Sequence, residues 1–483
     1  MMTQKSNYLI TVSFSLVFAA SVVLAQDDIA EGIPKPSKQG VAVQLFDWRF
    51  VDIEKVIPRL QELGYGYIHV SPPQEYNRSV EKWYKRYQPV DFFRFGDLGT
   101  EEEFRRMCLT AKQHGIAIWV DVVFNHMTSV DDPSGYVQME GDEVVRTMLP
   151  QFLPKHFNPR RRIEDVGEIK GWLFYGLADL NTENPYVRSV AKEFLKHLVD
   201  LGVAGFRFDA AKHIEPDFFP DVLSVVPHTF SFAEIANEDP TTFSDMLKIK
   251  DMYFYDFPLV TIMKDAFAYG GDLTTLLTAH KEGKSLQGNR AITFVRNHDI
   301  DRGQSKDSKG DFTDGGFNDS EGRSRFGIGW NESAKSLNRD DVLLAHAFIL
   351  GWDEGLPYVF VDMPGDSDDC KDDRFDDPRI VAAIRFHNLC LQENDQVEFR
   401  KAIPIIVERN MIGWQRGQDR FIVINKAAET VVISSIKTSL KAGVYKNILS
   451  GKNVTVPQDG VIAEYNFPVR SAMMYVWIGE VAD

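Results

Sequence analysis

Short apolar runs alternate with longer amphipathic stretches along most of the chain, beginning near residue 41. An alternation of this kind predicts strands connected by helices, and therefore a parallel sheet. In the run at 116–124 both faces are apolar, as a strand buried on both sides requires. Eight such strands predict an α/β fold of the (β/α)8 barrel type. The predicted strands cover residues 41–46, 66–71, 116–124, 205–209, 229–235, 251–255, 291–297 and 358–361.

Two stretches depart from this alternation. Residues 126–177 carry Gly, Pro and charged residues without a clear period, and so long an irregular stretch in a compact domain is usually functional. After about residue 404, short β-rich runs follow one another without helices, which predicts a small antiparallel β-sandwich. We therefore expect a barrel formed by 39–125 and 178–403, a small domain inserted at 126–177, and a C-terminal sandwich at 404–483.

The composition is that of a folded protein with a large core, since 44% of its 483 residues are hydrophobic. The formal net charge of −16 argues against non-specific binding to nucleic acid or to an anionic membrane, because both need a clustered basic surface. The chain has 3 cysteines, so one intramolecular disulfide at most can form. We expect a monomer that acts on a neutral or cationic substrate.

The first 25 residues resemble a secretory signal peptide. Lys5 precedes an apolar run over 8–20, and Val23-Leu24-Ala25 places small residues where signal peptidase cuts. The alternative is an uncleaved anchor, but the run is short for a membrane span. We expect cleavage after Ala25, a loose linker over 26–38, and a secreted protein that is free of the membrane once it has been cleaved.

Polar residues follow the ends of several predicted strands. Arg207 and Asp209 project from one face of the fourth strand, and alone they are typical of a partly buried ion pair. Glu234 and Asp299 follow the fifth and seventh strands, and the strand ends of a barrel converge at one mouth. Carboxyl groups held close raise one another's pKa, so one can stay protonated while another is ionised. Glycoside hydrolysis requires such a pair.

Four separated motifs resemble those of the α-amylase family, glycoside hydrolase family 13, in the order that the family has them. They are Asp121-Val122-Val123-Phe124-Asn125-His126, the stretch from Gly205 to His213, the strand end at Glu234, and Phe294-Val295-Arg296-Asn297-His298-Asp299. The resemblance runs from about Val41 to Ile478. Three further stretches resemble the branch that holds animal α-amylases and their bacterial relatives: Gln44-Leu45-Phe46-Asp47-Trp48-Arg49-Phe50, Val70-Ser71-Pro72-Pro73 and Arg86-Tyr87-Gln88-Pro89-Val90.

The resemblance implies three catalytic residues. Asp209 would be the nucleophile, Glu234 the general acid and base, and Asp299 the carboxylate that holds sugar hydroxyls and supports the transition state. Arg207 would keep Asp209 ionised, because a charge-assisted hydrogen bond lowers the pKa of a carboxyl.

The resemblance also implies a set of substrate-binding residues. His126 and His298 would bind sugar hydroxyls, although either alone is more typical of a core or loop histidine. Trp83 and Tyr84 would stack on distant glucose units, and ordinary core packing is the alternative for them. The complete set is Arg207, His126, His298, Tyr87, Gln88, Trp83, Tyr84, Lys212 and His213.

The insertion resembles the family's domain B, which holds a calcium ion against the barrel. By this resemblance Asn125 and Asp179 give side-chain oxygens, His213 gives its carbonyl, and Lys170 gives a further carbonyl. The alternative for Asp179 is to cap the helix that begins near residue 185. Members of this branch often bind chloride through an Arg, an Asn and a second basic residue. Arg207 and Asn297 fit, but Tyr358 stands at the third position, so we expect activity without chloride.

These observations predict a secreted α-amylase that cuts internal α-1,4-glucosidic bonds of starch or glycogen with retention of configuration. The nearest alternative is a transglycosylase or an oligosaccharide-specific α-glucosidase with the same residues. A catalytically inactive carbohydrate-binding ectodomain is a third possibility, and the presence of all three carboxyls argues against it.

Overall fold

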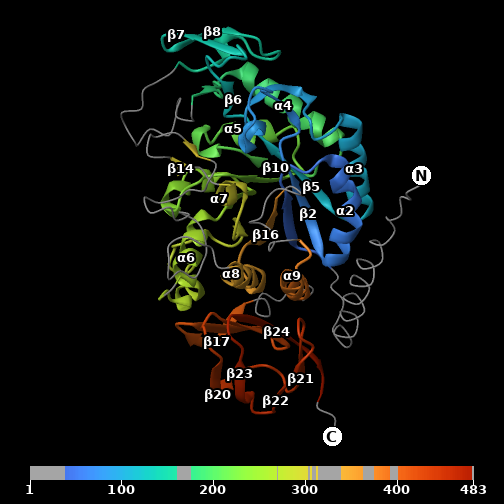
Figure 1. Ribbon diagram of the computed structural model, residues 1–483, viewed down its shortest axis with the longest axis vertical. Coiled ribbons are helices and arrows are strands. Elements are labelled where there is room, and N and C mark those ends of the chain that lie inside the picture. The colour runs from blue at the N-terminus through green and yellow to red at the C-terminus, as the bar shows by residue number, and fades with distance from the viewer. Residues whose placement is uncertain are drawn as a thin grey trace, which may run out of the picture.

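The computed structural model describes residues 38–159, 176–268, 270–302, 305–306, 312–313, 339–362, 375–391 and 401–480. Its centre is a closed barrel of parallel strands, which the described residues form in the order β1-β16-β13-β12-β11-β10-β5-β2 (Figure 1). The predicted barrel is therefore confirmed. The barrel strands are β1 (Val41–Leu45), β2 (Tyr65–Val70), β5 (Ala117–Val122), β10 (Gly205–Phe208), β11 (Phe230–Ala233), β12 (Met252–Tyr255), β13 (Ala291–Phe294) and β16 (Leu356–Val361).

Helices lie outside the barrel strands and cover them. Their apolar positions face the sheet; in α2, for example, Phe50, Ile53, Ile57, Leu60 and Leu63 are buried. The α-helices are α2 (Phe50–Leu63), α3 (Glu101–Gln113), α4 (Pro185–Asp200), α5 (Phe218–Leu223), α6 (Phe257–Phe267), α7 (His298–Arg302), α8 (Arg339–Gly351) and α9 (Pro378–Leu391). Short 3-10 helices are η1 (Trp83–Tyr87), η2 (Pro154–His156), η3 (Ala211–His213), η4 (Pro240–Phe243), η5 (Met246–Lys248) and η6 (Leu273–Leu277).

One glycine of the barrel is required by aromatic packing across strands. Trp119 of β5 stacks on Phe230 of β11 with ring centroids 4.5 Å apart, although β10 lies between these two strands. Gly205 of β10 is the register partner of both residues, and the two rings meet over it. A Cβ atom there would lie 2.5 Å from the Trp119 ring and 2.9 Å from the Phe230 carbonyl oxygen. Only glycine at this position leaves room for the two rings to stack.

The insertion after β5 contains more regular structure than its sequence suggests. Strands β6 (His126–Ser129) and β9 (Leu177–Asp179) pair with each other, and β7 (Val137–Glu140) pairs with β8 (Glu143–Thr147). β9 crosses the boundary that we predicted at residues 177 and 178. A further excursion, β3 (Gln74–Tyr76) with β4 (Pro89–Phe95), was not predicted. The short strands β14 (Ser305–Lys306) and β15 (Phe312–Thr313) also pair.

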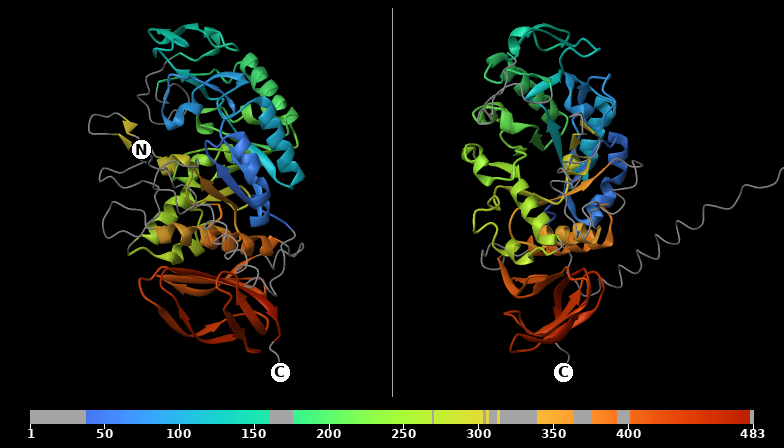
Figure 2. Two further views of the ribbon diagram at one scale, coloured as in Figure 1. Left: turned by 45° about the vertical axis from the view of Figure 1, so that its right-hand side comes forward. Right: turned by 60° about the vertical axis from the view of Figure 1, so that its left-hand side comes forward.

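The C-terminal part forms two antiparallel sheets around an apolar core of its own, as predicted (Figure 2). The larger sheet has the order β17-β18-β19-β24-β21-β22, and β20 pairs with β23. The strands are β17 (Ala402–Glu408), β18 (Met411–Arg416), β19 (Arg420–Asn425), β20 (Val431–Lys437), β21 (Gly443–Asn447), β22 (Asn453–Val456), β23 (Val461–Phe467) and β24 (Ser471–Gly479).

Buried cations and an indole join these sheets to the barrel. The ammonium of Lys426, whose side chain is fully buried, donates to the carbonyl oxygens of Ala266, Ala268 and Gly271 at 2.5, 3.1 and 2.9 Å. Trp414 Nε1 donates to the Gly351 carbonyl at 2.8 Å. These contacts add donors to carbonyls at and just beyond the ends of α6 and α8, where the helical hydrogen bonds end.

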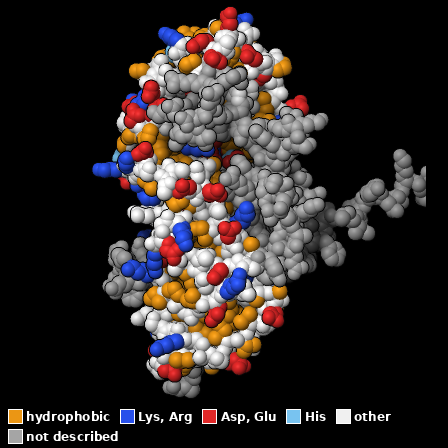
Figure 3. Space-filling model, turned by 90° about the vertical axis from the view of Figure 1, so that its left-hand side faces the viewer, with side chains coloured by type: hydrophobic (Ala, Val, Ile, Leu, Met, Phe, Trp, Pro, Cys, Tyr) orange, Lys and Arg blue, Asp and Glu red, His pale blue; other side chains and the backbone are white. Residues whose placement is uncertain are grey.

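The surface has a mixed charge. In the face drawn in Figure 3, acidic and basic side chains of the described residues are interspersed, and hydrophobic side chains gather over the C-terminal sheets. Within the described part of the chain, no helix is long and apolar enough to cross a membrane. The predicted signal peptide, the linker up to residue 37, Lys170 and Cys370 lie outside the described residues.

Candidate active site

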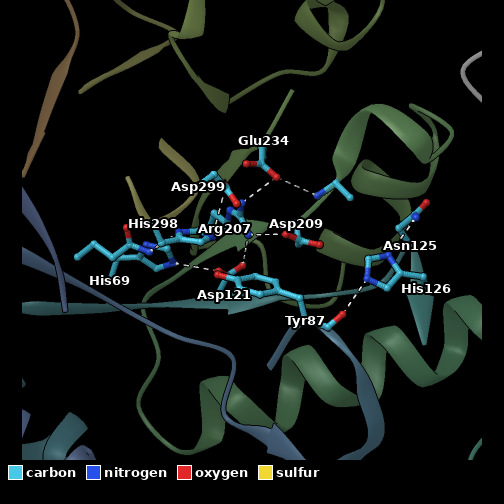
Figure 4. Close-up of polar contacts among 12 residues, drawn as sticks. His69, Tyr87, Asp121, Asn125, His126, Arg207, Asp209, Glu234, His298 and Asp299 are labelled. Carbon is cyan, nitrogen blue, oxygen red and sulfur yellow. Dashed lines mark hydrogen bonds and ion pairs between the residues drawn. The ribbon is translucent and has the colours of Figure 1, made fainter. Parts of the chain in front are cut away.

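The guanidinium of Arg207 lies at the centre of the polar site (Figure 4). Its Nη1 donates to Asp121 Oδ1 and to Asp209 Oδ1, each at 2.7 Å, and its Nη2 lies 2.8 Å from Glu234 Oε2. These carboxyls belong to the carboxyl ends of three adjacent strands, β5, β10 and β11. The site therefore lies where (β/α)8 barrels carry their chemistry. The Arg207 side chain is fully buried.

Three carboxyls share this single guanidinium, and that sharing decides their protonation. Burial raises the pKa of Asp209 to about 8, with Glu234 and Asp121 adding to the rise and Arg207 opposing it. Burial likewise raises the pKa of Asp121 to about 6 against the pull of Arg207. Arg207 lowers the pKa of Asp209, as the resemblance implies, while burial and two neighbouring carboxyls raise it.

Asp299 joins the group from the first turn of α7, directly after β13. Its Oδ2 lies 3.4 Å from His298 Nε2. Burial, followed by the charge of Glu234, raises the pKa of Asp299 well above its usual range. The structure thus brings Asp209, Glu234 and Asp299 together, and the site retains protons near neutral pH.

The ring of His298 lies between two aromatic rings. Phe46 stacks on it at 4.7 Å with an angle of 4° between the planes, and Tyr87 at 5.1 Å with an angle of 6°. The Tyr87 hydroxyl donates to Asp121 Oδ2 at 2.7 Å. Trp83 and Tyr84 are half-buried and pack against this cluster, so each combines a packed part with an accessible part.

His126 and Gln88 make contacts within the protein. The ring nitrogens of His126 lie 2.9 Å from the Tyr87 carbonyl oxygen and 3.1 Å from Asn125 Nδ2. Burial lowers the pKa of His126 to about 4, so its ring is neutral. Gln88 Oε1 accepts hydrogen bonds from Thr128 and Ser129 of β6. Both residues therefore tie the β4 region to the start of the insertion.

Lys212 and His213 lie in η3, immediately after β10. Ala210, which precedes them, has a φ of 47°, and its N–H lies 3.4 Å from Glu234 Oε2. Burial lowers the pKa of Lys212 against the pull of Glu234. The charge of His213 acts on the ring of His126. Lys212 and His213 thus lie in a turn that leads from the carboxyl cluster toward the insertion.

The predicted calcium ligands that the structure describes come from adjacent segments. His126 and Asp179 are paired residues of β6 and β9, and Leu180 N–H donates to the Asn125 carbonyl at 3.0 Å. Burial raises the pKa of Asp179 to about 7, with a smaller contribution from Glu215. The alternative of a helix cap is wrong, because Asn184 caps α4.

A buried carboxyl, a buried amide and a backbone carbonyl form a hard-oxygen donor set, and a cation would offset the burial of the Asp179 carboxylate. The residues therefore fit calcium. Groups of three or more His, Cys, Asp or Glu with metal-binding geometry are absent from the described residues, so the fit rests on amide and carbonyl oxygens.

Arg207 and Asn297, the two residues that match the family's chloride ligands, have buried N–H donors. Arg207 Nε and Asn297 Nδ2 have no hydrogen-bond partner among the described residues. Tyr358 lies 2.6 Å from His69 Nδ1 through its hydroxyl and supplies no positive charge. The set therefore lacks the second cation.

Gln44 and His69 were missing from the predicted site, and Asp121 was predicted at a strand end without a role. All three side chains are fully buried in barrel strands. His69 Nε2 lies 3.9 Å from Asp121 Oδ2, and Gln44 Nε2 lies 3.1 Å from His298 Nδ1. The available signal was a single polar residue inside an apolar run, as in Val41-Ala42-Val43-Gln44-Leu45.

Carboxyls gathered at the carboxyl ends of barrel strands are an arrangement that glycoside hydrolysis can use. The sequence model of the "Alpha amylase, catalytic domain" matches residues 52–253. The α-amylase of Tenebrio molitor is 26% identical over 86% of this chain and 92% of its own length, and an α-amylase of Aeromonas hydrophila is 28% identical over 72% and 77%. The chain belongs to the α-amylase family and is a glycoside hydrolase.

Solved structures share the fold. The α-amylase I of Eisenia fetida, in complex with maltohexaose, aligns with a TM-score of 0.70 and 22% identity over 91% of this chain and 98% of that chain. A three-domain cyclomaltodextrin glucanotransferase aligns with a TM-score of 0.66 and 20% identity over 91% and 99%. Hydrolases and transferases of this family therefore share the architecture.

Proposed function

We propose that the protein is a secreted α-amylase that hydrolyses internal α-1,4-glucosidic bonds of starch or glycogen with retention of configuration. The observation that carries this proposal is the gathering of Asp209, Glu234 and Asp299 around Arg207 at the ends of neighbouring barrel strands. Retention requires a nucleophile and a proton donor, and Asp209 and Glu234 are two carboxyls that contact the same guanidinium.

In this mechanism Glu234 gives its proton to the glycosidic oxygen while Asp209 attacks the anomeric carbon. The carbon–oxygen bond to the leaving sugar breaks, and a covalent glycosyl–Asp209 ester forms. Glu234, now ionised, then takes a proton from a water molecule that attacks the same carbon and releases Asp209. Asp299 holds the sugar hydroxyls of the reacting unit. Arg207 supplies the positive charge that lets Asp209 ionise despite burial.

The remaining predicted residues would bind the glucan. We assign His298 and His126 to the hydroxyls of the sugar at the cleavage point, and Tyr87 with Gln88 to the platform beneath it. Trp83 and Tyr84 would stack on more distant units, since the C–H faces of sugars pack on aromatic rings. Lys212 and His213 would contact the leaving-group side. The half-buried state of Trp83 and Tyr84 is compatible with this role.

We propose that calcium joins the barrel to the domain inserted at 126–177. Asn125, Asp179 and the His213 carbonyl would hold it, and Lys170 would add a carbonyl. The ion would fix the insertion next to the site. The test is unfolding before and after removal of calcium with a chelator: a lower melting temperature, restored by Ca²⁺ and not by Mg²⁺, is expected. An unchanged melting temperature in a demonstrably calcium-free sample would contradict it.

Chloride should not be required, because Tyr358 stands where a cation would complete an anion site. Its hydroxyl is engaged with His69. Dialysed enzyme should keep its rate when chloride is added, and a large increase would show that the buried donors of Arg207 and Asn297 suffice to hold the anion.

We also infer secretion with cleavage after Ala25, and a monomer. The mature protein would then begin at Gln26, followed by a linker, a barrel at 39–125 and 178–403, and a C-terminal domain at 404–483. N-terminal sequencing of the exported protein and light scattering test these two points. A start at Met1 or a dimeric mass would contradict them.

Product analysis on soluble starch distinguishes the alternatives. Internal cutting lowers the viscosity quickly, transfer yields longer or cyclic products, and an exo-acting glucosidase releases glucose. The fold shared with a cyclomaltodextrin glucanotransferase is the reason to keep transfer as the second candidate. Asp209→Asn should abolish hydrolysis, and an Asp209→Asn protein as active as the parent would overturn the mechanism.

A further inference from the structure

Gln44 is a polar residue in a strand that is otherwise apolar. The five residues of β1 are all buried, and Gln44 is fully buried among them. Burying an amide without hydrogen bonds costs free energy, so its presence in a barrel strand needs a reason. Its Nε2 lies 3.1 Å from His298 Nδ1, and this contact joins residues 254 positions apart.

That contact determines where the imidazole proton lies. An amide nitrogen can only donate, so His298 Nδ1 must accept, and the proton of the neutral ring is on Nε2. His298 Nε2 in turn lies 3.4 Å from Asp299 Oδ2. The chain Gln44, His298, Asp299 therefore has one direction of donation, from β1 to the carboxylate at the start of α7.

Stacking alone does not determine this direction. Phe46 and Tyr87 hold the plane of the His298 ring, with angles of 4° and 6° between the planes. A ring turned by 180° within that plane, or protonated on the other nitrogen, would stack equally well. The amide of Gln44 contacts Nδ1 and therefore distinguishes these states.

The direction matters because Asp299 is the carboxyl that holds the sugar hydroxyls in the mechanism proposed above. Burial and the charge of Glu234 raise the pKa of Asp299 well above its usual range. A donor that faces Asp299 opposes this rise and favours the ionised form, which accepts hydrogen bonds from sugar hydroxyls.

We propose that Gln44 is a positioning residue: it sets the tautomer and orientation of His298, so that the Nε2–H of His298 faces the Asp299 carboxylate. The tautomer itself follows from geometry, whereas its effect on rate rests on the proposed function. The two parts are tested separately.

The first test is imidazole ¹⁵N NMR of the full-length protein labelled at its histidines, with the His298 signal identified by its loss in His298→Asn. The neutral tautomer protonated on Nε2 is expected. A ring protonated on Nδ1, or on both nitrogens at neutral pH, would overturn the inference without any variant of Gln44.

The second test is Gln44→Met, which keeps the length of the side chain and removes the donor. We expect a mixture of His298 tautomers and a kcat lower by about tenfold or more, the range typical of residues that orient a functional imidazole, with a smaller change in KM. Thr293→Val is the matched control, because Thr293 Oγ1 is buried in β13 without a hydrogen-bond partner among the described residues. It should leave the tautomer and both constants unchanged.

The outcomes distinguish the two claims. If the parent protein does not hydrolyse α-glucans, the proposed function fails, while the tautomer measurement still tests Gln44. If the parent is active and Gln44→Met keeps both the tautomer and kcat, the inference fails and the proposed function stands.

Discussion

Asp121→Asn should move the pH dependence of the enzyme in a direction that the geometry determines. Asp121 Oδ1 and Asp209 Oδ1 each lie 2.7 Å from the same atom, Arg207 Nη1, so the two oxygens are at most 5.4 Å apart, twice that distance. Two unit charges at this separation repel by roughly 3 kcal/mol at an effective dielectric constant of about 20. This energy corresponds to a change of about two in the pKa of either carboxyl.

Asp121 is ionised before Asp209, because their pKa values are raised to about 6 and about 8. Replacing Asp121 by the isosteric amide removes its charge, so the guanidinium of Arg207 interacts with one carboxylate fewer. Both effects lower the pKa of Asp209. Since the proposed nucleophile must be ionised, the acid limb of the kcat/KM profile should move to lower pH by about one to two units.

The assay is kcat/KM against pH with a neutral chromogenic maltooligosaccharide, alongside circular dichroism to verify folding. Asp256→Asn is the matched control, because Asp256 is another fully buried carboxyl and none of its described contacts reaches the site. A folded Asp121→Asn enzyme whose acid limb stays in place, or moves to higher pH, would refute the reasoning.

Three further predictions concern stability. Burial raises the pKa of Asp256 to about 7, so the folded state binds more protons than the unfolded state between about pH 4 and 7. The stability of the parent protein should therefore fall as pH rises through that window. Asp256→Asn should melt at a higher temperature than the parent by a margin that grows from pH 5 to 8, up to roughly 4 kcal/mol. A constant difference at every pH would contradict this. Lys426→Met removes the ammonium donor from three carbonyls, of which Ala268 also accepts from Gly271 N–H and Gly271 from Arg409 Nε, and should cost about 1–3 kcal/mol in urea unfolding, whereas exposed Lys248→Met should cost little. Gly205→Ala must displace the Trp119 ring or the neighbouring strand and should cost at least about 2 kcal/mol, and a melting temperature equal to that of the parent would show that the barrel yields there.

The barrel was predictable because its strands are buried on both faces and read as apolar runs between amphipathic helices. The excursion β3–β4 and the edge strand β17 were missed. In β17 the exposed Ile403 and Val407 break the alternation of buried and exposed positions that a sandwich strand normally shows. Strand pairs inside the insertion depend on contacts such as that of His126 with Asp179, which no local period reveals.

The gathering of Asp209, Glu234 and Asp299 was predictable because motifs at strand ends gave their positions. Their electrostatics were not, since the sign of the Asp209 shift depends on how many carboxyls share Arg207 and how deeply the group is buried. Gln44 was visible only as a polar exception in an apolar strand, and its partner lies in another motif. Sequence patterns thus located the groups, while the balance of burial and charge needed the three-dimensional arrangement.

The pairing of β1 with β16 can form only after β16 has been synthesised. The barrel closes between the first strand and the last, and Trp48 beside β1 donates to the Asp362 carbonyl, 314 residues away. Joining ends that distant costs about 5 kcal/mol of chain entropy. Until then, one edge of β1 has no partner strand. The C-terminal sheets then hold Gly351 and Trp352, just before β16, through Trp414 and Arg416. The C-terminal sheets, which are synthesised after β16, therefore stabilise the strand that closes the barrel. A chain truncated before residue 404 should be aggregation-prone even though Asp209, Glu234 and Asp299 are all present.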